Sequence, residues 1–363
     1  MERRKFLKAT MAAPMIGVLP WRDALAQAGD GWRTFQIVTR VEVAAPAGVT
    51  RAWVPLPFTE KSDWHNPLGN KWTGNAGAMK MATDGKYGAE MVYAEWGPGE
   101  KAPVLEVTSR FSTRNRAVDP WKTNPNAPKL SPAELKLNTA STLFIPTDGI
   151  VRDTARDITK GMKTDVDKAR AIYEWIVDNT FRDPKTRGCG VGDVKSLLES
   201  GNLGGKCADL NALYVGLARS VEVPARDVYG VRVAPSKYGY KSLGAGTANI
   251  TKAQHCRAEF FAKGYGWVAI DPADVRKVVL EEPPGNLPVG DEKVVAARKR
   301  LFGSWEMNWL AYNMGHDVKL PNATKAPKLP FLMYINAESD GELRDQLEPD
   351  SVRYTITARE ITA

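Results

Sequence analysis

After its first 30 residues, the chain alternates between apolar and polar residues in short runs separated by glycine and proline. An alternation of period two places the apolar side chains on one face of a β-strand, so each run predicts a half-buried strand. The first four runs span residues 34–41, 50–54, 91–96 and 104–113. Successive strands of this kind are typical of an antiparallel fold, and we therefore expect residues 30–116 to form a β-sandwich-like domain.

The pattern changes beyond residue 116, where a segment rich in proline and asparagine predicts a linker over residues 117–141. Thr164 and Asp167 then stand at the spacing of a capping box, ahead of apolar residues that recur with a helical period. A second short helix is predicted over residues 193–199. Because helices are followed here by further strands, we expect residues 142–282 to form a second domain, of the α+β class.

The most informative stretch begins with two glycines at residue 204 and continues into a helix. One buried helical face is indicated by apolar residues at i, i+3, i+4 and i+7, namely Leu210, Leu213, Tyr214 and Leu217. Cys207 falls in the first turn, where unpaired backbone N–H groups and the positive end of the helix dipole stabilise a thiolate and lower the thiol pKa. The alternative is that Cys207 is simply a small apolar residue at the start of a buried helix.

Two strands downstream of this helix place a histidine beside a carboxylate. Alternation predicts strands over residues 226–233, 255–261 and 267–272, and a Gly-Tyr-Gly turn joins the last two into a hairpin. His255 opens the hairpin and Asp271 closes it, so we expect their side chains to meet across the pair. An imidazole oriented by a carboxylate is the base that a cysteine nucleophile requires.

Four short motifs follow one another between residues 143 and 278. They are Gly-Gly-Lys-Cys207-Ala-Asp, Val223-Pro224-Ala225-Arg226, His255, and Gly266-Trp267-Val268 leading to Asp271-Pro272. Their order resembles the transglutaminase-like superfamily of papain-related cysteine enzymes. The resemblance implies a papain-like catalytic core in which Cys207 is the nucleophile, His255 the general base and acid, and Asp271 the orienting carboxylate. One departure is Cys256-Arg257, where family members often carry Ala-Trp, and it concerns the acyl-binding groove more than the triad.

The resemblance implies acyl transfer through a thioester on Cys207, with a protein or peptide as substrate and no cofactor. The Cys207 backbone N–H would hold the oxyanion, and Asn202 is a candidate second donor. An amine acceptor would make the enzyme a protein-glutamine transamidase, and water would make it an amidase or peptidase; the residues do not separate these outcomes. The alternative from another class is a non-catalytic binding or scaffolding protein. No metal site is expected, since His65 and His316 lack partners at ligand spacing.

The N-terminus has the features of an export signal. Arg3-Arg4 precedes Phe6-Leu7-Lys8, an apolar stretch over residues 9–21 follows, and Ala24-Leu25-Ala26 supplies a small-residue cleavage pattern. We expect residues 1–28 to be a twin-arginine signal peptide, removed on export of the folded protein to the bacterial periplasm. The alternative is a basic tail on a cytosolic protein. The apolar stretch is too short to cross a bilayer, so no membrane span is expected.

The formal net charge of the chain is +8, of which the first 26 residues carry +3. Nucleic-acid binding requires clustered lysine and arginine with interleaved aromatics, and no such cluster occurs, so we expect no nucleic-acid partner. Arg298-Lys299-Arg300 is interpreted as a solvated helix face. A mildly basic surface would suit anionic periplasmic polymers, which makes a peptidoglycan peptide one candidate substrate. The sequence does not indicate an oligomeric state.

Three cysteines have to be placed in an oxidising compartment. One reactive thiol and one disulfide is the simplest solution, which makes Cys189–Cys256 the candidate bridge. Strand alternation would turn Cys256 to the face opposite His255, away from Cys207. A regulatory Cys189–Cys207 disulfide is the less favoured alternative.

Residues 283–363 form a C-terminal extension that begins after Pro283-Pro284. A helix is predicted over residues 291–302, and alternation predicts strands over residues 331–336 and 352–358. Two strands are few for a separate domain, so we expect them to complete the catalytic sheet rather than form an appendage.

Overall fold

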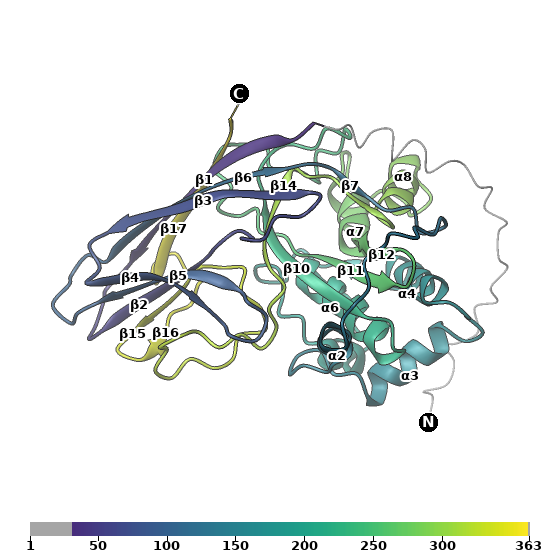
Figure 1. Cartoon of the computed structure of the whole chain (residues 1–363), viewed down its shortest axis with the longest axis horizontal. Coiled ribbons are helices and arrows are strands. Elements are labelled where there is room, and N and C mark those ends of the chain that lie inside the picture. The colour runs from purple at the N-terminus through teal and green to yellow at the C-terminus, as the bar shows by residue number, and fades with distance from the viewer. Residues whose placement is uncertain (1–30, 362–363) are drawn as a thin grey trace.

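The computed structural model describes residues 31–361, so the predicted signal peptide of residues 1–28 lies outside the described chain. Figure 1 shows two halves: a β half made of two sheets, and a half in which helices surround a third sheet. This mixture of helices and antiparallel sheets confirms the predicted α+β class. No helix among the described residues is long and apolar enough to cross a membrane.

Two antiparallel sheets form the β half. The first contains, in order, β17 (Val352–Ile361), β1 (Arg33–Val43), β6 (Val104–Thr113) and β3 (His65–Gly74). The second contains β16 (Glu342–Leu343), β15 (Asn336–Ser339), β2 (Thr50–Pro55), β5 (Glu90–Trp96) and β4 (Ala78–Thr83). Their apolar faces share one buried cluster that includes Phe35, Val54, Trp96 and Phe111, as sandwich packing requires.

The four strands predicted in this region correspond to β1, β2, β5 and β6. β3 and β4 were not predicted because most of their residues are exposed and show little alternation. Both lie at the outer edges of their sheets, where only one side of the strand is paired.

The third sheet belongs to the other half and contains, in order, β12 (Gly266–Ile270), β11 (Arg257–Ala262), β10 (Ala225–Arg232) and β14 (Trp309–Asn313). Two short pairs join distant segments: β7 (Arg116–Ala117) with β13 (Ser304–Trp305), and β8 (Phe181–Arg182) with β9 (Gly204–Gly205). β14 was not predicted because all five of its residues are buried, which leaves no alternation to detect.

The C-terminal strands do not complete the third sheet, and that expectation is wrong. Of the strand predicted over residues 331–336, only Asn336 lies in a strand, at the start of β15. β17 pairs with β1 from Thr34↔Ile361 to Val43↔Val352, and β15 pairs with β2. β14 already occupies the edge beside β10. Figure 1 shows β17 (yellow) beside β1 (purple), so both ends of the described chain build the β half. Alternation specifies the apolar face of a strand but not the sheet edge that it joins.

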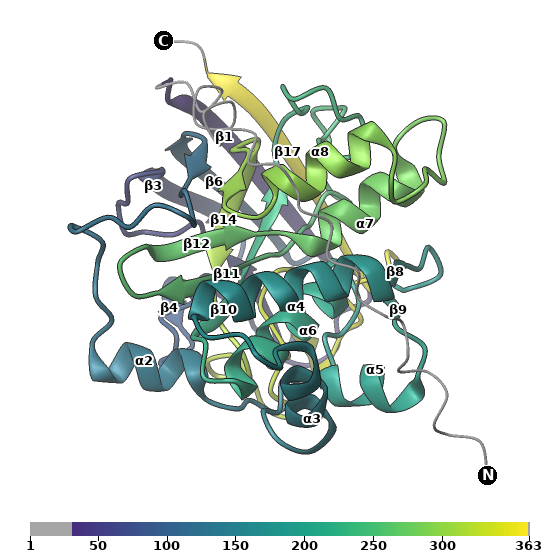
Figure 2. The same cartoon turned by 90° about the vertical axis from the view of Figure 1, so that its right-hand side faces the viewer.

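Seven helices in the described chain accompany the third sheet. They are α2 (Pro132–Thr139), α3 (Gly149–Ile158), α4 (Asp165–Asn179), α5 (Val194–Ser200), α6 (Cys207–Ser220), α7 (Pro272–Glu281) and α8 (Glu292–Arg300). α2 lies inside the predicted linker and begins with a Ser131–Glu134 capping box. Figure 2 shows α4 and α6 running side by side. α6 also contacts α3, α5, α7, β10 and β11, which explains why nearly all of it is buried.

Candidate active site

Cys207 is the first residue of α6, and the half-buried carboxylate of Asp209 anchors the chain around it. Asp209 accepts three backbone hydrogen bonds of 3.0 Å, one from Lys206 and two from the glycine-rich loop that precedes α5. In this loop Gly190 has a φ of +91°, and a Cβ there would lie 1.9 Å from the Asp209 carboxylate, so only glycine fits. Asp209 belongs to the motif around Cys207, but its anchoring role was not predicted.

His255 and Asp271 lie side by side, as the hairpin predicts. His255 lies just before β11, and Asp271 follows β12 and caps α7. Nε2 of His255 lies 2.7 Å from Oδ2 of Asp271, and both side chains are buried. Because this bond occupies Nε2, Nδ1 is the ring nitrogen left for Cys207, which lines the same cleft as His255.

Asp271 is held by two further donors. Its Oδ1 accepts from the backbone N–H of Asp274 at 3.0 Å and from Nδ2 of Asn211 at 3.4 Å. Asn211 lies one turn after Cys207 on α6 and is fully buried. One helix therefore positions both the sulfur and the carboxylate. Asn211 was not predicted, although its i+4 spacing from Cys207 places it on the same helix face.

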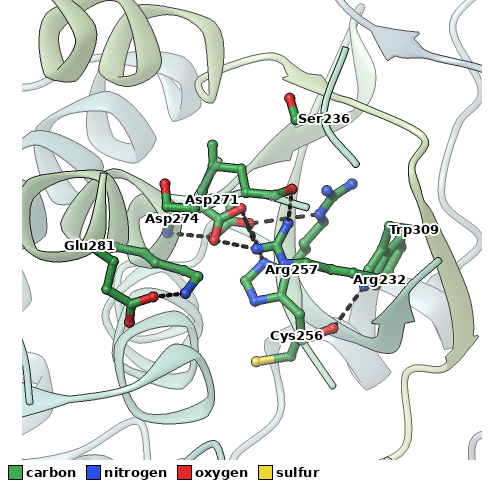
Figure 3. A network of polar contacts seen from close by, with 12 residues as sticks. Arg232, Ser236, Cys256, Arg257, Asp271, Asp274, Glu281 and Trp309 are labelled. Carbon is green, nitrogen blue, oxygen red and sulfur yellow. Dashed lines mark hydrogen bonds and ion pairs between the residues drawn. The ribbon is translucent and has the colours of Figure 1, made fainter. Parts of the chain in front are cut away.

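A second buried carboxylate lies beside the imidazole. Oδ2 of Asp274 is 3.4 Å from Nε2 of His255, and both Asp274 oxygens accept from Arg232, at 2.6 and 2.8 Å. Nε of Arg257 lies 3.7 Å from Asp271. Figure 3 shows Arg232, Arg257, Asp271 and Asp274 in one polar network. Of these four residues only Asp271 was predicted, because buried ion pairs between separate strands and helices leave no local pattern in the sequence.

This network makes the imidazole a strong base. Burial and the charge of Arg232 lower the pKa of His255, but Asp274 and Asp271 outweigh them and raise it to about 10. Two carboxylates near one ring would also repel each other, and the bidentate ion pair with Arg232 offsets that repulsion. The imidazole is therefore an imidazolium at neutral pH.

The neighbouring thiols favour the opposite charge on Cys207. The neighbouring thiols of Cys189 and Cys256 hold the pKa of Cys207 well below its usual range despite burial, and His255 lowers it further. The two shifts favour a thiolate on Cys207 paired with an imidazolium on His255. A nucleophile of this kind needs no separate deprotonation step.

The two other cysteines differ from expectation. All three cysteines are free thiols, so the predicted Cys189–Cys256 disulfide is not formed. Cys256 packs in the same buried cluster as Cys207 instead of pointing away from it, and that prediction is wrong. The physical reason is that β11 begins only at Arg257, so strand alternation does not extend back to residue 256.

Cys207 and His255 line a cleft of about 990 Å³ between the two halves of the molecule. The cleft wall also includes the loop around Cys189, the segment after β10, and residues 352–355 of β17. Cys207 is only 4% exposed, but it lies at the surface of a cleft large enough for a peptide segment.

Asn202, the expected oxyanion donor, lies outside this cleft. It is exposed on the turn before β9, where its Oδ1 accepts a hydrogen bond from the Gly204 N–H at 3.2 Å. Its position therefore contradicts the predicted role. The remaining donor is the backbone N–H of Cys207, which has no acceptor within the helix because it is the first helical residue.

His255, Asp271 and Asp274 together have the donor types of a metal site, with ligand atoms within 4.8 Å of one another. Their chemistry favours proton handling instead. Both Asp274 oxygens and one Asp271 oxygen are engaged by neighbouring donors, and the guanidinium groups of Arg232 and Arg257 oppose a bound cation.

Comparison with known proteins agrees with this geometry. Residues 152–272, which include Cys207, His255 and Asp271, match the model of the transglutaminase-like superfamily. An uncharacterized protein of Haemophilus influenzae is 35% identical over 327 residues, covering 86% of this chain and 87% of that protein. A Cytophaga hutchinsonii protein described as a candidate cysteine protease has a solved structure with a TM-score of 0.56, at 12% identity over 92% of both chains. This last likeness shows a shared fold alone.

Proposed function

Because the chain belongs to the transglutaminase-like superfamily, we propose that it is a cysteine-dependent acyltransferase or hydrolase acting on amide bonds through a Cys207 thioester. The observation that carries the proposal is the connected arrangement of sulfur, imidazole and carboxylate in the cleft. Cys207 and His255 line the same cleft, and Nε2 of His255 lies 2.7 Å from Oδ2 of Asp271. A non-catalytic binding protein requires neither a thiolate nor a buried imidazolium.

In the first half of the reaction the Cys207 thiolate adds to the carbonyl carbon of an amide. The backbone N–H at the start of α6 donates to the oxyanion that forms. The imidazolium of His255 then gives its Nδ1 proton to the nitrogen of the departing amine, and the C–N bond breaks. The products are a free amine, a neutral imidazole and an acyl group held on sulfur as a thioester.

In the second half, the neutral imidazole takes a proton from the acceptor as the acceptor attacks the thioester. The C–S bond breaks, and the thiolate and imidazolium are restored. With a lysine amine as acceptor and a protein glutamine as donor, the reaction is transamidation. With water as acceptor, the enzyme is an amidase or a peptidase. Asp271 acts as a positioning residue in both halves, since its bond to Nε2 keeps Nδ1 directed at the sulfur.

The predicted twin-arginine signal supports a periplasmic site of action. Replacing Arg3 and Arg4 together with lysine should leave the protein in the cytoplasm, as measured by cell fractionation. Periplasmic protein at wild-type levels in this variant would contradict the twin-arginine route.

The proposed chemistry is tested by the reactivity of the Cys207 sulfur. Iodoacetamide should alkylate Cys207 of the folded protein at pH 6 at least about tenfold faster than the same cysteine in denatured protein, because only the folded form holds a thiolate. His255→Ala should remove most of this advantage. Peptide mapping by mass spectrometry assigns the label among the three cysteines. If folded Cys207 reacts no faster than the denatured control, the non-catalytic scaffold is the better description.

A further inference from the structure

The cleft at Cys207 has a strong excess of positive charge. Apart from His255, eight of its lining residues are lysine or arginine, and one, Glu42, is acidic. A charge excess in a cleft with low-dielectric walls is focused rather than dispersed, and it raises the local concentration of ligands of opposite sign. How much of the excess survives depends on which cations have carboxylate partners.

Three of the eight cations are neutralised by one carboxylate each. The pairs are Arg40–Glu42, Arg187–Asp345 and Arg232–Asp274. Two more cations, Arg182 and Lys277, share the single carboxylate of Glu281, which leaves one positive charge over. Burial lowers the pKa of Lys277, and repulsion from Arg182 lowers it further, as expected where two cations compete for one anion.

The other three cations have no carboxylate partner within residues 31–361. Lys206, next to Cys207, donates its Nζ to the backbone carbonyl of Thr186 at 2.7 Å, which leaves its charge intact. Lys252 and Arg353 are exposed, and neither side chain forms a hydrogen bond or ion pair with the described chain. The cleft therefore has about four uncompensated positive charges.

Two of these charges lie on a continuous rim that leads to the catalytic histidine. Arg353 lies on β17, and Lys252 lies in the loop that ends at His255. This loop is fastened to β17, because Ile250 N–H donates to the Ile356 carbonyl at 2.8 Å and Ile356 N–H donates to Thr251 Oγ1 at 2.9 Å. The rim is thus built into the fold and cannot swing away from the sulfur independently.

From this placement we propose that the site is specific for acidic peptides, in which carboxylate side chains flank the amide that Cys207 attacks. Arg353 and Lys252 would bind those carboxylates at the rim, and Lys206 would draw the segment toward the sulfur. The inference rests on the proposed thioester chemistry and adds the substrate class to it. A peptide is favoured over other polyanions because the nucleophile acts on amide bonds.

The inference can be tested without knowing the natural substrate, through protection of Cys207 from iodoacetamide. The probes are three capped decapeptides rich in glutamate, glutamine or lysine. For the wild type at low ionic strength, the glutamate peptide should protect Cys207 at concentrations at least about tenfold lower than the glutamine peptide, and the lysine peptide should not protect. Raising the salt concentration to about 0.5 M should reduce the preference, because these charges are solvent-exposed.

Charge reversal locates the preference in the cleft. The double variant Lys252→Glu/Arg353→Glu should lose most of the glutamate preference, with protection measured relative to the alkylation rate of the same variant without peptide. Lys71→Glu, an exposed residue of β3 outside the cleft, is the matched control and should behave as wild type. This substitution changes the net charge as much as either rim substitution does, but Lys71 does not belong to the rim.

The outcomes separate the two proposals. Slow alkylation of wild-type Cys207 would overturn the thioester chemistry itself. Fast alkylation with equal protection by the glutamate and glutamine peptides would leave the chemistry standing and overturn the acidic-peptide specificity. Protection by a sulfated polysaccharide or by single-stranded DNA equal to that by the glutamate peptide would also overturn it, since the cleft would then bind any polyanion.

Discussion

Replacing Asp271 with asparagine removes the charge that faces His255 but keeps a hydrogen-bond acceptor of the same shape. The Nε2–Oδ2 distance is 2.7 Å, and Asp271 is fully buried. A hydrogen bond to a charged group contributes about 1.5–3 kcal/mol, and one pKa unit corresponds to about 1.36 kcal/mol. The substitution should therefore lower the pKa of His255 by about 1–2 units. That moves it from about 10 to about 8–9.

The pH dependence of Cys207 alkylation measures this shift. The lower inflection of the rate profile reports formation of the thiolate, and the upper one reports loss of the imidazolium. In Asp271→Asn the upper inflection should move down by about 1–2 pH units. The lower inflection should move up, because a less stable imidazolium stabilises the thiolate less. Asp271→Ala should lower turnover further than Asp271→Asn, since it also removes the acceptor that orients the ring.

The control is Asp178→Asn, which removes a carboxylate on α4 that pairs with Arg298. It should leave both inflections at their wild-type positions. If the profile of folded Asp271→Asn coincides with that of wild type, Asp271 does not determine the charge of the imidazole. The ion pair between Cys207 and His255 would then need another explanation.

Three further predictions follow from individual contacts. Gly190→Ala should lower the free energy of unfolding by about 2 kcal/mol or more in urea titrations, because it combines a strained φ with a clash against Asp209; an unchanged midpoint would contradict the close approach. Burial raises the pKa of Asp227 to about 8, so between its unfolded value near 3.8 and that pH the folded protein binds more protons and loses stability as pH rises. Asp227→Asn should therefore gain more in Tm at pH 8 than at pH 5, whereas parallel Tm curves would argue against a protonated carboxyl. Cys256→Ala removes a donor to the Cys207 thiolate and should slow its alkylation at pH 6 but not at pH 9, and equal slowing at both would indicate a loss of access instead.

The elements that the sequence predicted are those whose pattern is local. β1 and β6 were predicted from alternation, and both alternate between buried and more exposed residues. β2, β5 and α6 were predicted from their sequence patterns although most of their residues are buried. β14 was missed because all of its residues are buried, and β3 because half of its residues are exposed. The placement of β17 failed for a different reason. Its alternation was correct, but the edge that it joins lies more than 300 residues away along the chain.

In the candidate site, too, the residues specified by a local sequence pattern were predicted, and those that depend on contacts between separate elements were not. Cys207, His255 and Asp271 could be found because a helix start and two hairpin ends specify where those side chains lie. Their supporting groups could not, because Asp274, Arg232 and Asn211 act through contacts between separate elements. Asn202 was predicted but lies outside the cleft, because closeness to Cys207 along the chain does not bring its side chain into the cleft.

β17 couples the stability of the β half to the specificity of the cleft. It pairs with β1 along its whole length, buries Val352 and Ile356 in the sandwich core, and lines the cleft with residues 352–355. The strand cannot leave the cleft without breaking its pairing with β1, so the β half forms a rigid wall of the site rather than a mobile lid. A fragment limited to residues 142–282 would keep Cys207, His255 and Asp271 but lose this wall, the charge of Arg353 and the β14 edge of its own sheet. The three proposed catalytic residues alone therefore do not define the functional unit, because the surface that would select a substrate is built from both ends of the described chain.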